Sequence, residues 1–155
     1  MDARDADIVE LLQRDGRRPQ AEIAQHVHLS QPAVAERIRK LEERGVITGY
    51  SARVDPAKLG KDVTAFVGVA ISHPRHFEAF MQRIQALPDV LEAHRVVGRD
   101  SYLLKVRTKN TASLDRLLVG TLRTIPGVTR TETTVVLASV KETTFVPVDR
   151  EEEHR

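Results

Sequence analysis

Residues 20–45 of the chain read QAEIAQHVHLSQPAVAERIRKLEERG, and this pattern is typical of two short helices joined by a tight turn. Ser30 predicts the start of the second helix, because its hydroxyl can accept a hydrogen bond from a first-turn N–H that lacks a partner inside the helix. Pro32 fits the first turn, where a missing N–H costs little. Apolar side chains then recur at spacings of four and three, which predicts one buried side for a helix over residues 31–43. They are Val34, Ile38 and Leu41.

The opposite side of this second helix is polar and is predicted to face outward. It carries Pro32, Glu36, Arg39, Lys40 and Glu43, with Gln31, Ala35 and Arg37 on its flanks. Residues 20–27 also have helical apolar spacing, and only three residues separate the two helices. Such a pair predicts a helix-turn-helix, whose second helix enters the major groove of DNA. A helical hairpin with merely solvated charges is the alternative that periodicity leaves open.

The composition predicts a soluble globular protein with one larger or two small domains. The chain has 155 residues, of which 41% are hydrophobic and 30% charged. We find neither an apolar run long enough to span a bilayer nor a signal peptide, so we expect a cytoplasmic protein without a membrane partner. The absence of cysteine excludes disulfides, thiolate nucleophiles and cysteine-ligated zinc.

Positive charge is local rather than global. The formal net charge is +2, and residues 1–55 hold nine basic side chains against ten acidic ones. The cations on the second helix or directly after it are Arg37, Arg39, Lys40 and Arg44, and Arg17 and Arg18 precede the first helix of the pair. A single copy with so few basic side chains to contact phosphates should bind DNA weakly. We therefore expect specific binding to require at least two copies.

The sequence on either side of the helix pair divides the chain into four parts. A first helix is expected over residues 2–15, and a strand from Tyr50 to Val54 is expected after the helix pair, followed by a linker. The resulting division is a helix-turn-helix domain at 1–49, a strand and linker at 50–61, a second domain at 62–148 and a charged, disordered tail at 149–155.

The second domain contains an internal repeat of strand, helix and strand. Its two closing turns, Leu87-Pro88-Asp89-Val90 and Ile125-Pro126-Gly127-Val128, lie 38 positions apart. Two such halves predict a ferredoxin-like βαββαβ domain, with a four-stranded antiparallel sheet and both helices on one face. The expected elements are strand 63–71, a helix from Pro74, a strand ending at Val97, strand 102–108, helix 113–124 and a strand ending at Leu137.

Both faces of the first strand of this sheet are apolar. Phe66, Gly68 and Ala70 alternate with the residues that the helices would cover. Monomers rarely leave such a face open, so we expect two copies to pack sheet against sheet with two-fold symmetry.

The sequence contains few residues or motifs typical of catalytic, metal or ligand-binding sites. The six histidines form no convincing metal site, and the glycine-rich motifs of hydrolases and nucleotide-binding enzymes are missing, so we predict no metal, no cofactor and no catalysis. The stretch Gly98-Arg99-Asp100-Ser101 is consistent with a bare hairpin turn. Alternatively, Arg99 could hold a carboxylate and Asp100 an ammonium, with Tyr102 and Leu104 beside them, which is a site for a zwitterion such as an amino acid.

Many short motifs in register resemble the Lrp/AsnC family, the feast/famine transcriptional regulators of bacteria and archaea. They cover nearly the whole chain. They are Asp5-Ala6-Asp7-Ile8-Val9, Gly16-Arg17, Glu22-Ile23-Ala24, Leu29-Ser30, residues 37–42, residues 45–50, Asp55-Pro56, Leu59-Gly60, the Gly98 turn, residues 125–128 and Lys141.

The resemblance implies an α+β protein with an N-terminal winged or three-helix helix-turn-helix domain and a C-terminal ferredoxin-like ligand-binding (RAM) domain. It further implies a homodimer that assembles to a tetramer or octamer, a pseudo-palindromic DNA operator, and a small effector, usually an amino acid, bound between dimers. The residues it assigns to DNA are Ser30, Gln31, Pro32, Glu36, Arg37, Arg39 and Lys40, with Gln31 and Glu36 nearer the bases. Those it assigns to the effector are Gly98, Arg99, Asp100, Ser101, Tyr102 and Leu104, with Thr129 and Thr131 as weaker candidates.

One departure affects the effector. The family turn is often Gly-Asp-x-Asp, whereas this turn has an arginine at the second position and a serine at the fourth. Leucine is therefore not implied as the ligand. Two other functions stay open on this architecture: a tetrapyrrole (siroheme-type) decarboxylase, and an amino-acid sensor that coats DNA without sequence specificity.

Overall fold

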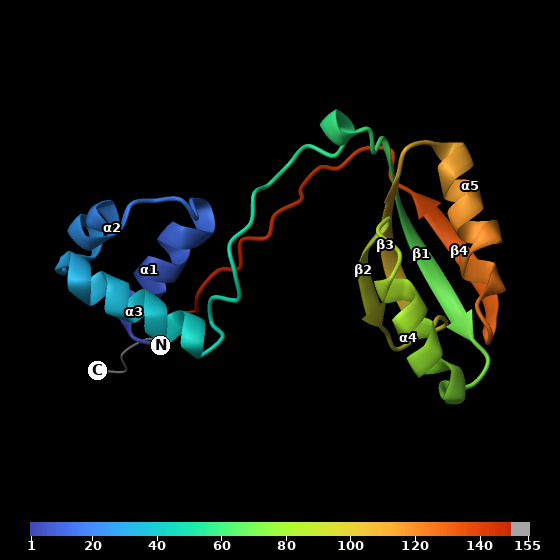
Figure 1. The fold of residues 1–155 in the computed structure, drawn as a ribbon, viewed down its shortest axis with the longest axis horizontal. Coiled ribbons are helices and arrows are strands. Elements are labelled where there is room, and N and C mark those ends of the chain that lie inside the picture. Colours follow the sequence, from blue (N-terminus) through green and yellow to red (C-terminus); the bar gives the residue numbers. More distant parts are fainter. Residues whose placement is uncertain (150–155) are drawn as a thin grey trace. The chain divides into compact units, whose positions relative to one another are not determined.

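The computed structural model describes residues 1–149, so the tail predicted at 149–155 lies outside the described residues except for Asp149. Within the described part of the chain, no helix is long and apolar enough to cross a membrane. The chain divides into two compact units (Figure 1). The helical unit comprises Met1–Arg53 and the segment that begins at Lys141, and the sheet unit comprises Val54–Val140.

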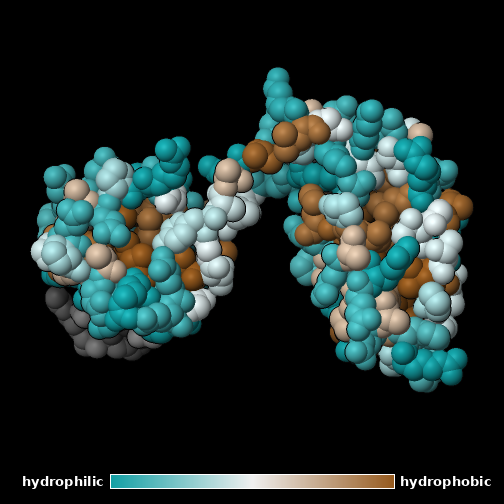
Figure 2. Space-filling model, viewed as in Figure 1, coloured by the Kyte–Doolittle hydropathy of each residue, from teal (hydrophilic) through white to brown (hydrophobic). Residues whose placement is uncertain are grey.

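The helical unit contains three helices: α1 (Ala3–Arg14), α2 (Gln20–Val27) and α3 (Gln31–Glu43). The last two have the bounds predicted from the sequence. Their apolar sides share one small core, and in Figure 2 hydrophobic side chains show between these helices while hydrophilic ones cover most of the visible surface. The buried members of this core are Ile8, Val9, Leu11, Ile23, Ala24, Val27, Val34, Ile38 and Leu41.

The segment from Lys141 is grouped with the helical unit, whereas the sequence-based division assigned it to the second domain. The side-chain amide of Gln13 donates to the carbonyl of Val146 at 2.8 Å and accepts from its N–H at 2.7 Å. The Arg14 guanidinium lies 4.9 Å from the centre of the Phe145 ring, and Val148 packs against the helical core. These contacts join residues far apart in sequence, so no local sequence pattern predicts them.

The prediction of a strand from Tyr50 to Val54 is wrong. In the described part of the chain these residues form no strand, and no wing follows α3. A strand exists only where a neighbouring segment accepts and donates its backbone hydrogen bonds, and β propensity alone does not supply that neighbour. A short 3-10 helix, Ala57–Leu59, follows instead.

The sheet unit has the predicted βαββαβ order. Its elements are β1 (Val63–Ile71), α4 (Phe77–Gln85), β2 (Val90–Arg95), β3 (Tyr102–Thr108), α5 (Thr111–Gly120) and β4 (Val128–Val135). The strand order is β2-β3-β1-β4 and every neighbouring pair is antiparallel (Figure 1). The helix expected at 113–124 ends earlier, and a 3-10 turn, Leu122–Thr124, completes it.

Both helices of the sheet unit cover the same face of the sheet. Alternate residues of β1 and β3 are buried there with Phe80 and Ile84 of α4 and Leu114 and Leu117 of α5. On the opposite face Phe66 and Leu103 are each 39% exposed. The centre of that face is apolar, as predicted, and the Lys105–Glu92 ion pair lies beside it on β3 and β2.

Candidate functional site

The exposed side of α3 is held in place by its N-cap and its buried side. The Ser30 hydroxyl accepts a hydrogen bond from the Ala33 N–H at 3.3 Å, and the Ser30 backbone is extended as an N-cap requires. Val34 and Leu41 are almost completely buried, which sets the rotation of the helix about its axis. The side chains that this rotation leaves exposed include Gln31, Pro32, Glu36, Arg39 and Lys40.

The turn before α3 has an unusual backbone. His28 follows α2 in the left-handed conformation with φ 54°, and it is the one described non-glycine residue with positive φ. Its N–H and that of Leu29 both reach the carbonyl of Ala24, which is how this short connection ends one helix and begins the next. A glycine is the usual residue here, so the sequence offered no local signal for this conformation.

Arg37 points to α1 rather than to the outer side of α3. Its Nη1 atom lies 2.7 Å from the Asp2 carboxylate and 2.6 Å from the Asp5 carboxylate. Asp2 is also the N-cap of α1 and accepts from the Asp5 N–H at 2.7 Å. The Asp5 N–H and then the Arg37 guanidinium lower the pKa of Asp2. The sequence grouped Arg37 with the DNA-facing cations, but its position gives it a structural contact between two helices.

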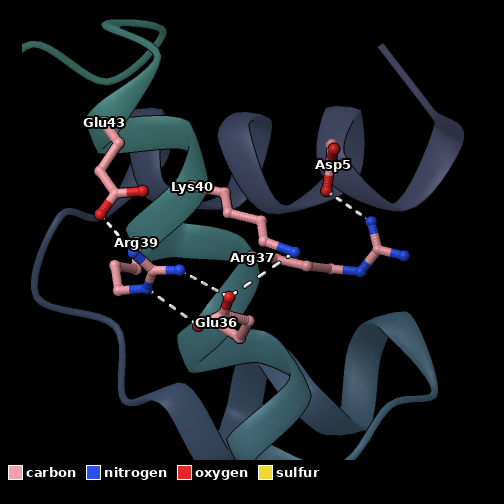
Figure 3. A network of polar contacts seen from close by, with 6 residues as sticks. All are labelled: Asp5, Glu36, Arg37, Arg39, Lys40 and Glu43. Atoms are coloured by element: carbon pink, nitrogen blue, oxygen red, sulfur yellow. Dashed lines mark hydrogen bonds and ion pairs between the residues drawn. The ribbon is translucent and has the colours of Figure 1, made fainter.

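The exposed cations of α3 are paired with carboxylates of the same helix (Figure 3). The Nε and Nη2 atoms of Arg39 donate to the two oxygens of Glu36 at 2.9 and 2.7 Å, and its Nη1 atom pairs with Glu43. The Lys40 ammonium lies 3.6 Å from Glu36. The hydrogen bond from Arg39 is the main cause that lowers the pKa of Glu36 to about 2. The hydrogen bond from Glu36 in turn raises the pKa of Arg39.

This network changes the electrostatic description of α3. The helix holds three cations, Arg37, Arg39 and Lys40, and three carboxylates, those of Glu36, Glu42 and Glu43, so its side chains carry no net charge. Glu42 accepts a hydrogen bond from the Tyr50 hydroxyl at 2.9 Å. The surface is thus rich in hydrogen-bonding groups that suit base edges and phosphates but provides little unopposed positive potential.

The second candidate site is the turn between β2 and β3. The Asp100 carboxylate lies 2.6 Å from Nη2 of Arg130 on β4, and it packs so closely on Gly68 of β1 that an added Cβ there would overlap it. The Ser101 hydroxyl accepts from the Ile71 N–H at 3.2 Å. Arg99 is 69% exposed and lies 3.3 Å from Glu132. The two charges at the tip of the turn already have partners on the edge strand β4.

Tyr102 and Leu104 do not line this site within one chain, contrary to the expectation from the turn. They are 3% and 0% exposed, on the face of the sheet that the helices cover. The Tyr102 ring packs edge-to-face against Phe77 and at a tilt against Phe80 there, with ring centres 5.5 and 4.8 Å apart. Side chains two apart on a strand share a face, so both belong with the core.

The threonines of β4 lie beside a small surface pocket of about 290 Å³. Arg123 donates from Nε to the Thr131 hydroxyl at 2.9 Å, and the Thr129 hydroxyl donates to the carbonyl of Ala70 at 3.2 Å. Arg130 belongs to this pocket and also pairs with Asp100, so it connects the pocket to the turn. Sequence reasoning missed Arg130, although strand alternation places it on the same face as Glu132.

Comparisons with known proteins agree with both halves of this architecture. The family model of the AsnC-type helix-turn-helix domain matches residues 1–42, and that of the Lrp/AsnC ligand binding domain matches residues 64–146. The chain is 36% identical over 148 residues to the HTH-type transcriptional regulator FL11 of Pyrococcus horikoshii, covering 96% of this chain and 97% of that protein. It is 38% identical over 144 residues to the leucine-responsive regulatory protein of Escherichia coli, covering 92% of this chain and 88% of that protein.

Solved structures give the same result. A transcriptional regulator from Neisseria meningitidis in complex with L-methionine has a TM-score of 0.91 at 28% identity, covering 95% of this chain and 96% of that one. The feast or famine regulatory protein of M. tuberculosis complexed with L-methionine has a TM-score of 0.88 at 34% identity, covering 95% and 99%. The chain with its capped, exposed third helix and its ferredoxin-like ligand-binding domain belongs to the Lrp/AsnC family of transcriptional regulators.

Proposed function

We propose that the protein regulates transcription as a homodimer whose two α3 helices enter successive major grooves of a pseudo-palindromic operator. The single observation that supports this most is the exposed side of α3, which is capped at Ser30 and anchored through Val34 and Leu41. Gln31 and Glu36 contact base edges, and Arg39 and Lys40 contact phosphates. We propose that the role is regulatory rather than catalytic and that the protein acts in the cytoplasm, where it would meet its DNA.

Dimerisation is proposed to use the open face of the sheet. Phe66 and Leu103 expose apolar surface there, and the Lys105–Glu92 pair lies on the same face. Two copies related by a two-fold axis would cover this surface. They would also supply a second α3 helix, which DNA binding requires because one α3 helix carries little unopposed positive charge. Such dimers are proposed to assemble further into a tetramer or an octamer.

An amino acid is proposed as the effector, bound between dimers near residues 98–101. Two relatives of this fold were solved with L-methionine. The turn offers the exposed Arg99 for a carboxylate and the partly buried Asp100 for an ammonium group, and an effector would take the place of their present partners, Glu132 and Arg130 of β4. Binding there would alter the oligomer and thereby DNA binding.

The test of DNA recognition begins with enrichment of bound sequences from a random duplex pool. The full-length protein should bind the enriched duplex at least about a thousand times more tightly than random DNA. Gln31→Ala should reduce this ratio. Equal affinity for enriched and random duplexes would reject specific regulation in favour of a nonspecific DNA-coating protein.

The test of the effector is sedimentation velocity with each of a panel of amino acids, L-methionine included. A ligand should shift the distribution of oligomers for the wild-type chain, and Asp100→Asn should abolish the shift. An unchanged response in this variant would place the effector away from the turn.

A further inference from the structure

Every cation of α3 meets a carboxylate of the protein itself. Arg37 is held by Asp2 and Asp5, and Arg39 by Glu36 and Glu43, while Lys40 lies near Glu36. Figure 3 shows the Arg39 and Lys40 side chains both turned toward Glu36, although both remain more than half exposed. Glu36 is therefore the common partner of the two cations on the outer side of the helix.

The contact between Arg39 and Glu36 has the form that a nucleic acid would use. Two adjacent nitrogens of the guanidinium, Nε and Nη2, donate to the two oxygens of one carboxylate. A phosphate group, or the O6 and N7 atoms of guanine, accepts from the same kind of fork. The carboxylate of Glu36 and DNA thus compete for the same donor atoms.

We propose that Glu36 is a specificity-determining residue, because its carboxylate withholds Arg39 and Lys40 from phosphates of DNA that lacks the right bases. The inference rests on the proposed contact of α3 with DNA. To contact the phosphates of random DNA, these two cations must move away from the Glu36 carboxylate. The carboxylate then lies near phosphates without a base amino group to donate a hydrogen bond to it. On the operator, Glu36 accepts from an amino group of cytosine or adenine as the cations turn to the backbone.

Nonspecific affinity is the quantity that this arrangement lowers. It comes almost entirely from cations that neutralise phosphates and release counterions, with a slope of log affinity against log salt of about −0.9 for each phosphate contact. A cation already neutralised by a carboxylate releases fewer counterions. Glu36 therefore reduces binding to random sequence without an equal loss at the operator, and the ratio between the two affinities rises.

The experiment compares the wild-type chain with Glu36→Gln on two duplexes, the enriched site and a random sequence, over a range of salt concentrations. Glutamine keeps the size of the side chain and removes its charge. Affinity for random DNA should rise about fivefold to tenfold, and its salt slope should steepen by about 1 for each subunit in contact. Affinity for the enriched site should rise less or fall, so that discrimination decreases.

Two further variants separate position from net charge. Glu43→Gln removes only the single contact with Nη1 of Arg39 and should raise random-sequence affinity less than Glu36→Gln. Glu78→Gln makes the same change of charge at an exposed position on α4 of the sheet unit. It should leave both affinities within about twofold of the wild-type values. Circular dichroism checks helical content, which should persist because Glu36 is exposed.

The outcomes distinguish the inference from the proposal beneath it. If the wild-type chain itself fails to prefer its enriched site, both are rejected. If the wild type discriminates but Glu36→Gln keeps the same ratio and the same salt slopes, only the role of Glu36 is rejected. The role is also rejected if Glu78→Gln raises random-sequence affinity as much as Glu36→Gln, since net charge then suffices as the cause.

Discussion

Arg37 provides a clear test of whether a cation in α3 contacts DNA or supports the helix. Its guanidinium bridges Asp2 and Asp5, and the exposed fractions of the three side chains are 31%, 54% and 14%. Such partly exposed pairs contribute only about 0.2–1 kcal/mol each after solvent screening. Arg37→Met, which keeps the aliphatic stem, should therefore lower the stability of the helical unit by about 1 kcal/mol.

Native-state hydrogen exchange followed by mass spectrometry can assign this loss to α1 and α3. A loss of about 1 kcal/mol corresponds to a roughly fivefold faster exchange of amides that open with the helical unit, while amides of β1 and β3 should be unaffected. The pKa of Asp2 is lowered by the Asp5 N–H and then by Arg37, so this stabilisation is present above the ordinary value of 3.8 and is lost as the pH falls through the folded value. The difference between variant and wild type should accordingly shrink in acid.

DNA binding supplies the contrasting readout. On the enriched duplex, Arg37→Met should leave the slope of log affinity against log salt unchanged, whereas Lys40→Ala should reduce it by about 1 for each subunit. A slope that drops in Arg37→Met while α1 and α3 exchange at the wild-type rate would refute the structural role and restore Arg37 to the DNA contacts.

Three more predictions address the remaining features. Leu104→Ala should destabilise the sheet unit by about 2–5 kcal/mol, because the side chain is fully buried, and thermal unfolding that is unchanged would contradict its place in the core. Phe66→Asp should shift sedimentation from dimer to monomer, and a dimer that persists would place the interface elsewhere. Partial burial of the half-exposed Tyr50, and second its contact with Glu42, raise its pKa to about 12, so ultraviolet titration should show a tyrosinate forming well above pH 10 that Tyr50→Phe removes. Since folding favours the neutral phenol, the contribution of Tyr50 to the free energy of unfolding is present below about pH 10 and lost by about pH 12, and a component removed by Tyr50→Phe that titrates near pH 10 would contradict the raised pKa.

The elements that were predictable depend on local signals. The bounds of α3 follow from Ser30, Pro32 and the spacing of its apolar residues, because caps and periodicity act within a few residues. The order of the sheet follows from a repeat whose two closures, 38 positions apart, can be compared directly. In both cases the chain itself contains the information within one element or one repeat.

The features that sequence reasoning missed depend on distant partners. The return of Phe145 and Val146 to α1 joins segments more than a hundred residues apart, and Arg37 finds Asp2 and Asp5 only after α1 and α3 have packed. Tyr102 and Leu104 are a different case. Strict alternation along β3 puts them on the same face as Val106, which the helices cover. The prediction assigned them to the effector site instead, because they directly follow the turn in sequence.

The central claim, that the outer side of α3 lies in the major groove, is tested most directly by methylation protection of guanine N7, an atom exposed only in that groove. On its enriched duplex the wild-type protein should protect guanines in two patches centred about one helical turn apart, and Gln31→Ala should weaken the protection within those patches. Guanines that stay fully reactive while the protein is bound would contradict the account.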